Sequence, residues 1–209
     1  MEKSYGNIAA ALIFNGAMVA LFMQALLRPE ANAEWIFRGA FLIFIFEFLA
    51  IFAQLWPIKL VDEWKKSDAI KKTGVVVQGV IISLFILGFT FGFSYLAGNV
   101  AAGGYFVISM IAKYVSHAKN GMDMKATYAG ILIFMGTLMA VSFTSPVWPA
   151  IFPFPESVLA QKIDGSSGMF VDAPQVQLVW GALYFLGLTM YELKKPIIDA
   201  WFTKYQVKK

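Results

Sequence analysis

Six long apolar stretches divide this 209-residue chain and constrain its fold more than any other feature. An α-helix rises about 1.5 Å per residue, so about 20 apolar residues are needed to cross the hydrocarbon core of a bilayer. The stretches lie at about 7–27, 36–56, 74–97, 100–117, 127–145 and 176–193. They predict an all-α, polytopic integral membrane helix bundle with six transmembrane helices, forming a single membrane domain over residues 1–209.

The composition agrees with a chain that lies mostly in lipid. Only 14% of the residues are charged and 59% are hydrophobic, whereas a soluble domain is roughly one quarter charged. The chain has no Cys and one His, which excludes disulfides, thiolate metal sites and Cys nucleophiles. We therefore expect no cofactor and no metal. The net charge of +4 is typical of loops that face anionic lipid headgroups, and we expect no nucleic acid partner.

The basic residues give the chain an orientation. If the six stretches alternate across a membrane, fourteen of the seventeen Lys and Arg residues fall on one side, and only Arg28, Arg38 and Lys162 fall on the other. Basic residues near helix ends stay on the cytoplasmic side. The distribution predicts an integral protein of the plasma (inner) membrane with both termini cytoplasmic. It also supports the short fourth span, because without it Lys119 and Lys125 would move outside.

Two segments outside the spans have patterns of their own. Residues 146–175 should form an extracytoplasmic cap loop, stiffened by five prolines, with a short helix starting at Pro155 or Glu156. Residues 196–209 follow Pro196 with apolar side chains at helical spacing, which predicts a cytoplasmic interfacial amphipathic C-terminal helix. The cap could act as a lid over a site or as a docking surface for a partner, unless its apolar side chains fold back onto the bundle. The candidate docking residues are Trp148, Phe152, Phe154 and Phe170.

Glu47 is the most informative single residue, because it lies near the middle of the second predicted span. An ionised carboxylate at that depth costs at least about 2.5 kcal/mol. Protonation, the cation Lys113 or polar groups of neighbouring helices would offset that cost. Two interpretations stay open: a structural, hydrogen-bonded Glu, or a group that handles ions or protons. The candidate intramembrane polar site comprises Glu47, Asn15, Gln54, Lys113 and Thr137.

Small and polar residues recur at helical spacing in several of the predicted spans. The third span carries the seam Gly79, Ser83, Thr90 and Ser94, together with a small-xxx-small pair, Gly88 and Gly92. Small residues let membrane helices approach closely. Such seams indicate either close helix packing or a hydrated path.

No catalytic motif is evident. The Gly-x-Ser-Gly string at 165–168 resembles that of rhomboid-type intramembrane proteases, but a serine nucleophile needs a base within hydrogen-bond reach. The only His, His117, falls on the opposite side of the predicted membrane. We therefore expect no enzyme. The first function hypothesis is a non-catalytic subunit or scaffold of a larger membrane complex, with other membrane protein subunits as partners, whereas a monomer or a homo-oligomer is expected under the alternative. The alternative is a small ion, proton or solute transporter or channel.

Overall fold

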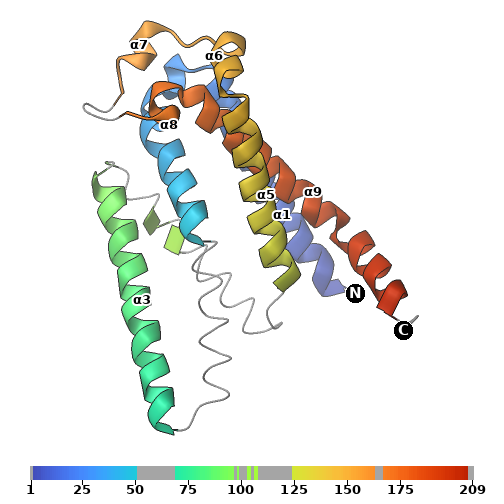
Figure 1. Ribbon diagram of the computed structural model, residues 1–209. Coiled ribbons are helices and arrows are strands. Elements are labelled where there is room, and N and C mark those ends of the chain that lie inside the picture. The colour runs from blue at the N-terminus through green and yellow to red at the C-terminus, as the bar shows by residue number, and fades with distance from the viewer. Residues whose placement is uncertain are drawn as a thin grey trace. The chain divides into compact units, whose positions relative to one another are not determined.

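The computed structural model describes residues 2–50, 69–96, 98, 103–104, 106–107, 124–162 and 167–206. All regular secondary structure in these ranges is helical (Figure 1). The chain divides into two compact units. Unit 1 comprises Met1–Ala33 and Leu132–Lys209, and unit 2 comprises Glu34–Ile131. The sequence prediction of an all-α protein is confirmed for the described part of the chain.

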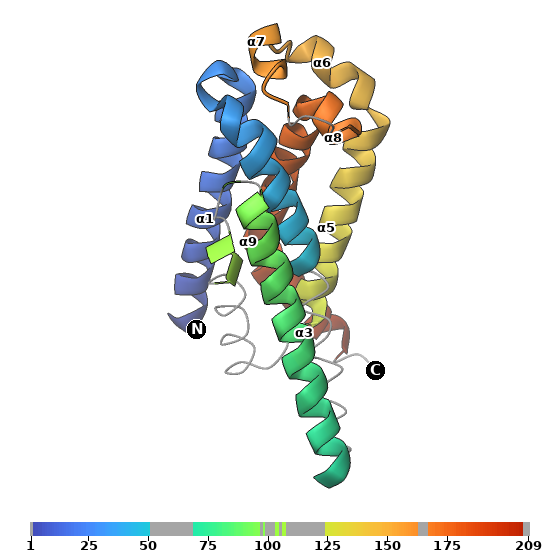
Figure 2. The same cartoon turned by 90° about the vertical axis from the view of Figure 1, so that its left-hand side faces the viewer.

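Unit 1 is built on two antiparallel helices, α1 (Glu2–Leu27) and α9 (Pro174–Gln206). Figures 1 and 2 show them side by side, with the start of α1 and the end of α9 at the same end of the pair. Gly181 of α9 lies against the fully buried ring of Phe22 on α1. Phe185 packs against Phe22 and Phe14, with ring centroids 5.9 and 6.2 Å apart. The missing side chain of Gly181 thus lets the two helices approach closely.

The third long helix of this unit is α5 (Met124–Phe143), which belongs to unit 1 from Leu132 onward. Phe134 of α5 meets Trp180 and Tyr184 of α9 edge to face, at 5.1 and 5.6 Å between ring centroids. Edge-to-face aromatic pairs contribute about 0.5–1.5 kcal/mol beyond the area they bury. An aromatic cluster therefore joins α5 to α9.

Short helices cap the end of unit 1 where α1 ends and α9 begins (Figures 1 and 2). They are η1 (Glu30–Asn32), η3 (Ser145–Val147), α6 (Trp148–Ile151), α7 (Glu156–Leu159) and α8 (Met169–Asp172). The helix predicted to start at Pro155 or Glu156 is confirmed as α7, with Pro155 as its N-cap. Prolines suit helix starts because they lack the N–H that such positions leave unpaired.

Unit 2 contains η2 (Trp35–Gly39), a π-helical turn, then helical residues 40–50, and α3 (Ala69–Leu96). Its buried core consists of Leu42, Phe46, Ala50 and Phe106, with Ile86 and Phe93 of α3 packed against it. Helical spacing in the sequence predicts a protein-facing seam of this helix at Ala40, Ile43, Glu47, Ala50 and Gln54, of which Gln54 lies outside the described residues. Ala40 and Ala50 are buried as predicted, whereas Ile43 and Glu47 are half-buried and the core side chains are Leu42 and Phe46.

Fewer helices qualify as membrane spans than the sequence predicts. Thr73–Tyr95 of α3 and Pro174–Lys194 of α9 are long and apolar enough, and Tyr128–Phe143 with Ser145–Ile151 would add a third span bent by 59°. The apolar part of α1, Leu12–Leu27, is shorter. Most of the fourth predicted span and the end of the second lie outside the described residues. Two or three spans are supported, and the six-span topology and its orientation stay predictions.

The C-terminal segment continues α9. The sequence predicts a separate surface helix after Pro196, but α9 runs without interruption through Pro196 to Gln206. A proline within a helix removes one backbone hydrogen bond and commonly bends the helix without ending it, as in many membrane helices. Whether residues 196–206 lie at a membrane surface stays a prediction.

Candidate functional site

The five residues of the predicted polar site belong to different parts of the fold. Asn15 is buried on α1 and Thr137 is half-buried on α5, both in unit 1. Glu47 is half-buried in unit 2. Gln54 and Lys113 lie outside the described residues, so the ion pair considered for Glu47 and Lys113 stays a prediction.

Thr137 uses its hydroxyl within its own helix. Its Oγ1 donates to the carbonyl oxygens of Ile133 and Phe134, at 2.7 and 3.1 Å. This back-bond to the preceding turn is a common way for Thr to satisfy its hydroxyl in a membrane helix. Thr144 and Thr189 do the same, each at 2.8 Å from the carbonyl four residues earlier.

Two hydroxyls of α3 behave differently. Thr90 and Ser94 are both 0% exposed, and within the described part of the chain neither Oγ has a hydrogen-bond partner. Leaving a buried hydroxyl without a partner costs about 1–3 kcal/mol. Both residues belong to the seam predicted from the sequence. Ser83 of the same seam is exposed and Gly79 is half-buried, so the fully buried part of the seam is limited to Thr90 and Ser94.

Gly103, a helical residue that follows α3 in the chain, lies against Ser94. A Cβ on Gly103 would lie 2.5 Å from Ser94 Oγ and 3.1 Å from Ser94 Cβ. A Cβ on the adjacent Gly104 would meet nothing within 4 Å. Gly103 is therefore required for the approach of this turn to α3, and Gly104 is not. Both glycines lie near the start of the fourth predicted span, and Gly103 gives that start a close contact with α3.

Two buried glutamines near the start of α9, Gln175 and Gln177, were not among the residues predicted for the polar site. Gln175 Nε2 donates to the carbonyl oxygen of Phe152 at 3.0 Å, which ties the cap to α9. Gln177 is 2% exposed, and its Nε2 has no hydrogen-bond partner among the described residues. Two glutamines at the start of an apolar span could have been recognised, because a polar amide that enters a helix bundle has to find a partner.

The cap folds back onto unit 1 through only some of its apolar side chains. Phe154 is 9% exposed, while Trp148, Phe152 and Phe170 are half-buried. Trp148 Nε1 donates to Thr144 Oγ1 at 3.0 Å. The predicted use of these four residues for docking a partner stays a prediction. The cap side chains that face outward most are others, namely Val147 and Ile151.

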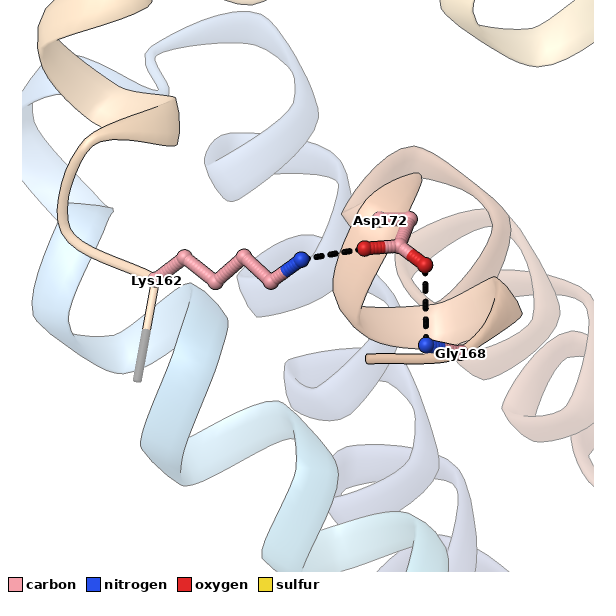
Figure 3. A network of polar contacts seen from close by, with 3 residues as sticks. All are labelled: Lys162, Gly168 and Asp172. Carbon is pink, nitrogen blue, oxygen red and sulfur yellow. Dashed lines mark hydrogen bonds and ion pairs between the residues drawn. The ribbon is translucent and has the colours of Figure 1, made fainter. Parts of the chain in front are cut away.

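An ion pair closes the outer part of the cap. Lys162, just after α7, pairs with Asp172 on α8, and the other carboxylate oxygen of Asp172 accepts a 2.8 Å hydrogen bond from the Gly168 N–H (Figure 3). The hydrogen bond from Lys162 and then that from Gly168 hold the pKa of Asp172 below its ordinary value of 3.8. Gly168 has a φ of +129°, a conformation that favours glycine. The contacts are exposed, so they shape the cap without forming a buried charged site.

The apolar surface of α3 is mostly exposed in the structure. Only 6% of its most apolar stretch is buried, against 50% for α9. Gly88 and Gly92 lie on the exposed side, and a Cβ at either position would meet nothing within 4 Å. Large exposed side chains share that side of the helix, namely Ile81, Leu84, Phe85 and Tyr95.

Comparison with known proteins adds no assignment. No family model matches the chain, and comparison with curated proteins and solved structures found no match. Among the described residues, no group of three or more Asp, Glu or His side chains is placed to hold a metal ion. Among the residues that the structure describes, the features that bear on function include the exposed face of α3, the two buried hydroxyls and the half-buried Glu47.

Proposed function

We propose that this chain is a non-catalytic, multi-pass membrane protein that serves as a subunit or scaffold of a larger membrane complex. Its topology has six spans with both termini cytoplasmic, in the plasma (inner) membrane. The interface is the side of α3 that carries Gly88 and Gly92. The partner is an apolar transmembrane helix of another membrane protein.

The observation that carries this proposal is the unused glycine pair. Exposed apolar side chains alone do not indicate a protein partner, because lipid tails are as apolar as leucine. Glycine is different, since each one inside a helix costs about 1 kcal/mol relative to alanine. No described neighbour occupies the space beside Gly88 or Gly92. A small-xxx-small pair on an exposed face of a membrane helix offsets this cost when a second helix packs closely against it.

The second candidate function is transport of ions, protons or a small solute, alone or as a homo-oligomer. It draws support from Glu47, Thr90 and Ser94, which place a carboxyl group and two fully buried hydroxyls in unit 2. Intramembrane ionisable groups commonly mark ion or proton pathways. The described polar groups do not extend along α3, since Ser83 on the same seam is exposed. We therefore place transport second.

The test is purification from native membranes in mild detergent, followed by mass spectrometry of the co-purifying chains. We expect a stable heteromeric complex, which the Gly88→Leu/Gly92→Leu variant loses while remaining folded, because a Cβ at either position meets no described atom within 4 Å. Gly136→Leu is the matched control, since Gly136 of α5 is also exposed and also has open space around it. A monomer or homo-oligomer would contradict the subunit role. A complex that survives the double variant would contradict α3 as its interface.

A further inference from the structure

The first part of the cap, η3 and α6, has an apolar surface. The exposed residues of these two short helices are all apolar, namely Pro146, Val147, Ala150 and Ile151. The sequence has no Asp, Glu, Lys or Arg between Lys125 and Glu156. The next helix, α7, differs, because it exposes the polar residues Glu156 and Ser157. The cap therefore has an apolar part and a polar part, and the polar part begins at Glu156.

We propose that η3 and α6 bind the lipid surface and lie in the headgroup layer of the bilayer, at the end of α5 opposite to Lys125. Helices of this kind place apolar side chains at the boundary between headgroups and acyl chains. The inference rests on one part of the proposed function, namely that α5 crosses the membrane. It is independent of a protein partner at α3. Tyr128–Phe143 and Ser145–Ile151 are together apolar enough to form one bent span.

The length of α5 brings its end to the membrane surface. Its 20 residues, Met124–Phe143, rise about 30 Å, which is the thickness of the hydrocarbon core. The chain then bends by 59° into η3 and α6 (Figure 2). Because of this bend, Ser145–Ile151 advances only about 5–6 Å further along the axis of α5. The headgroup layer is about 5–7 Å thick on each side, so the segment stays within it.

Polar groups at the bend are bonded within the chain, as a segment at the edge of the lipid requires. Trp148 Nε1 donates to Thr144 Oγ1 at 3.0 Å, and this hydroxyl donates to the carbonyl oxygen of Ala140 at 2.8 Å. At the end of α6, the Phe152 N–H donates to the carbonyl oxygen of Trp148 at 2.8 Å, and the Phe152 carbonyl oxygen accepts from Gln175. The bend thus exposes apolar side chains without leaving these polar groups to the lipid.

The exposed surface of η3 and α6 continues the exposed stripe of α5. Large apolar side chains recur at steps of three or four residues, namely Leu132, Met135, Met139, Phe143, Val147 and Ile151. Side chains at these steps share one side of a helix. On a helix that crosses a membrane, a stripe of this kind contacts lipid. The step of four residues is kept from Phe143 through the bend, so the same lipid contact extends from α5 onto α6.

The test is the depth of single spin labels on the whole protein in phosphatidylcholine vesicles, measured by electron paramagnetic resonance. A neutral lipid suffices, because the segment has no charge. The chain has no Cys, so each introduced Cys carries the only label. Collisions with oxygen increase toward the lipid interior, and collisions with a water-soluble nickel chelate increase toward water. For Val147→Cys and Ile151→Cys, we expect an oxygen-to-nickel collision ratio severalfold above that of Leu159→Cys and below that of Leu132→Cys.

Two controls separate the lipid contact of α6 from the proposed topology. Leu159 is apolar and exposed but lies on the polar part of the cap, and Leu132 is 72% exposed on α5. If the Leu132 label reports water, α5 is not a span, and both the six-span topology and the lipid contact are overturned. If Leu132 lies in lipid while Val147 and Ile151 match Leu159, only the lipid contact is overturned. Low collision rates with both reagents at Val147 and Ile151 would also overturn it, because protein would then cover α6.

Discussion

Gly181 is the position at which the structure allows the effect of a substitution on folding stability to be estimated most directly. It lies near the start of α9, and a Cβ placed there would come within 2.2, 2.4 and 2.4 Å of the Cε1, Cδ1 and Cζ atoms of Phe22. Ordinary carbon–carbon contacts are at about 3.5–4.0 Å. The Phe22 ring would have to move by more than about 1 Å to restore such a contact. It has little room, because it is fully buried and packs against Phe185.

Two opposing terms decide the effect of Gly181→Ala. Alanine is favoured over glycine inside a helix by about 1 kcal/mol. Overpacking of a tightly filled core costs about 1–3 kcal/mol, and occasionally more. Because the clash is with the stiff ring of Phe22, we expect the upper part of that range. The net loss of stability is then about 1–2 kcal/mol, after subtracting the helix-propensity gain.

The assay is thermal unfolding in mild detergent, followed by the helical circular dichroism signal. For a chain of this size, about 1 kcal/mol shifts Tm by about 2–4 °C, so Gly181→Ala should lower Tm by about 2–8 °C. Gly16→Ala on α1 is the control, because its Cβ would meet nothing within 4 Å, and it should raise Tm slightly. In a Phe22→Leu background the penalty of Gly181→Ala should shrink, with a coupling of about 1 kcal/mol. A Gly181→Ala protein at least as stable as Gly16→Ala would refute the reasoning.

Two other predictions concern charged groups. Asp172 has a lowered pKa, so its ion pair with Lys162 stabilises the cap at pH values above 3.8 and is lost as the pH falls below that value through the pKa of the folded state. Hydrogen exchange of the α8 amides, corrected for the intrinsic rate at each pH, should show that their protection falls as the pH drops below 3.8. In the Asp172→Asn variant this pH-dependent fall should be absent. If the fall persists in the variant, another titrating group causes it. Under the subunit role, Glu47→Gln should fold normally and leave proton and cation flux into liposomes unchanged, whereas a lower flux for this variant than for the unmodified protein would favour transport.

The helical elements were predictable because their signals are local. Runs of apolar residues about as long as a bilayer is thick predict α3 and the first part of α9, and the structure places these helices within a few residues of the predicted spans. Pro155 marks the start of α7 through an equally local signal, because proline restricts the backbone and lies as the extended N-cap just before the helix. The prediction failed at Pro196, where the sequence indicated a break and α9 continues.

The candidate site was predictable only as a set of residue types. Helical spacing placed Thr90 and Ser94 on one seam, but it could not distinguish them from Thr137, whose hydroxyl is satisfied by its own helix. Whether a hydroxyl bonds to its own helix depends on the side-chain rotamer and on burial, which spacing does not show. Spacing also paired Gly88 with Gly92 without showing whether a neighbouring helix already occupies that face. The role of Gln175 was missed because its partner, the carbonyl of Phe152, is 23 residues away in the chain.

By itself, the sequence determined that this chain is helical, that its long apolar segments suit a membrane and that Lys and Arg are unevenly distributed among its loops. These properties follow from short-range composition and from periodicity, which a single segment carries. The tertiary structure decided which small residues are used. Within the described part of the chain, Gly181 and Gly103 are closely packed, Gly88 and Gly92 face open space, and Thr90 and Ser94 are buried without partners. Such distinctions arise from contacts between segments far apart in the chain, and no local pattern encodes them.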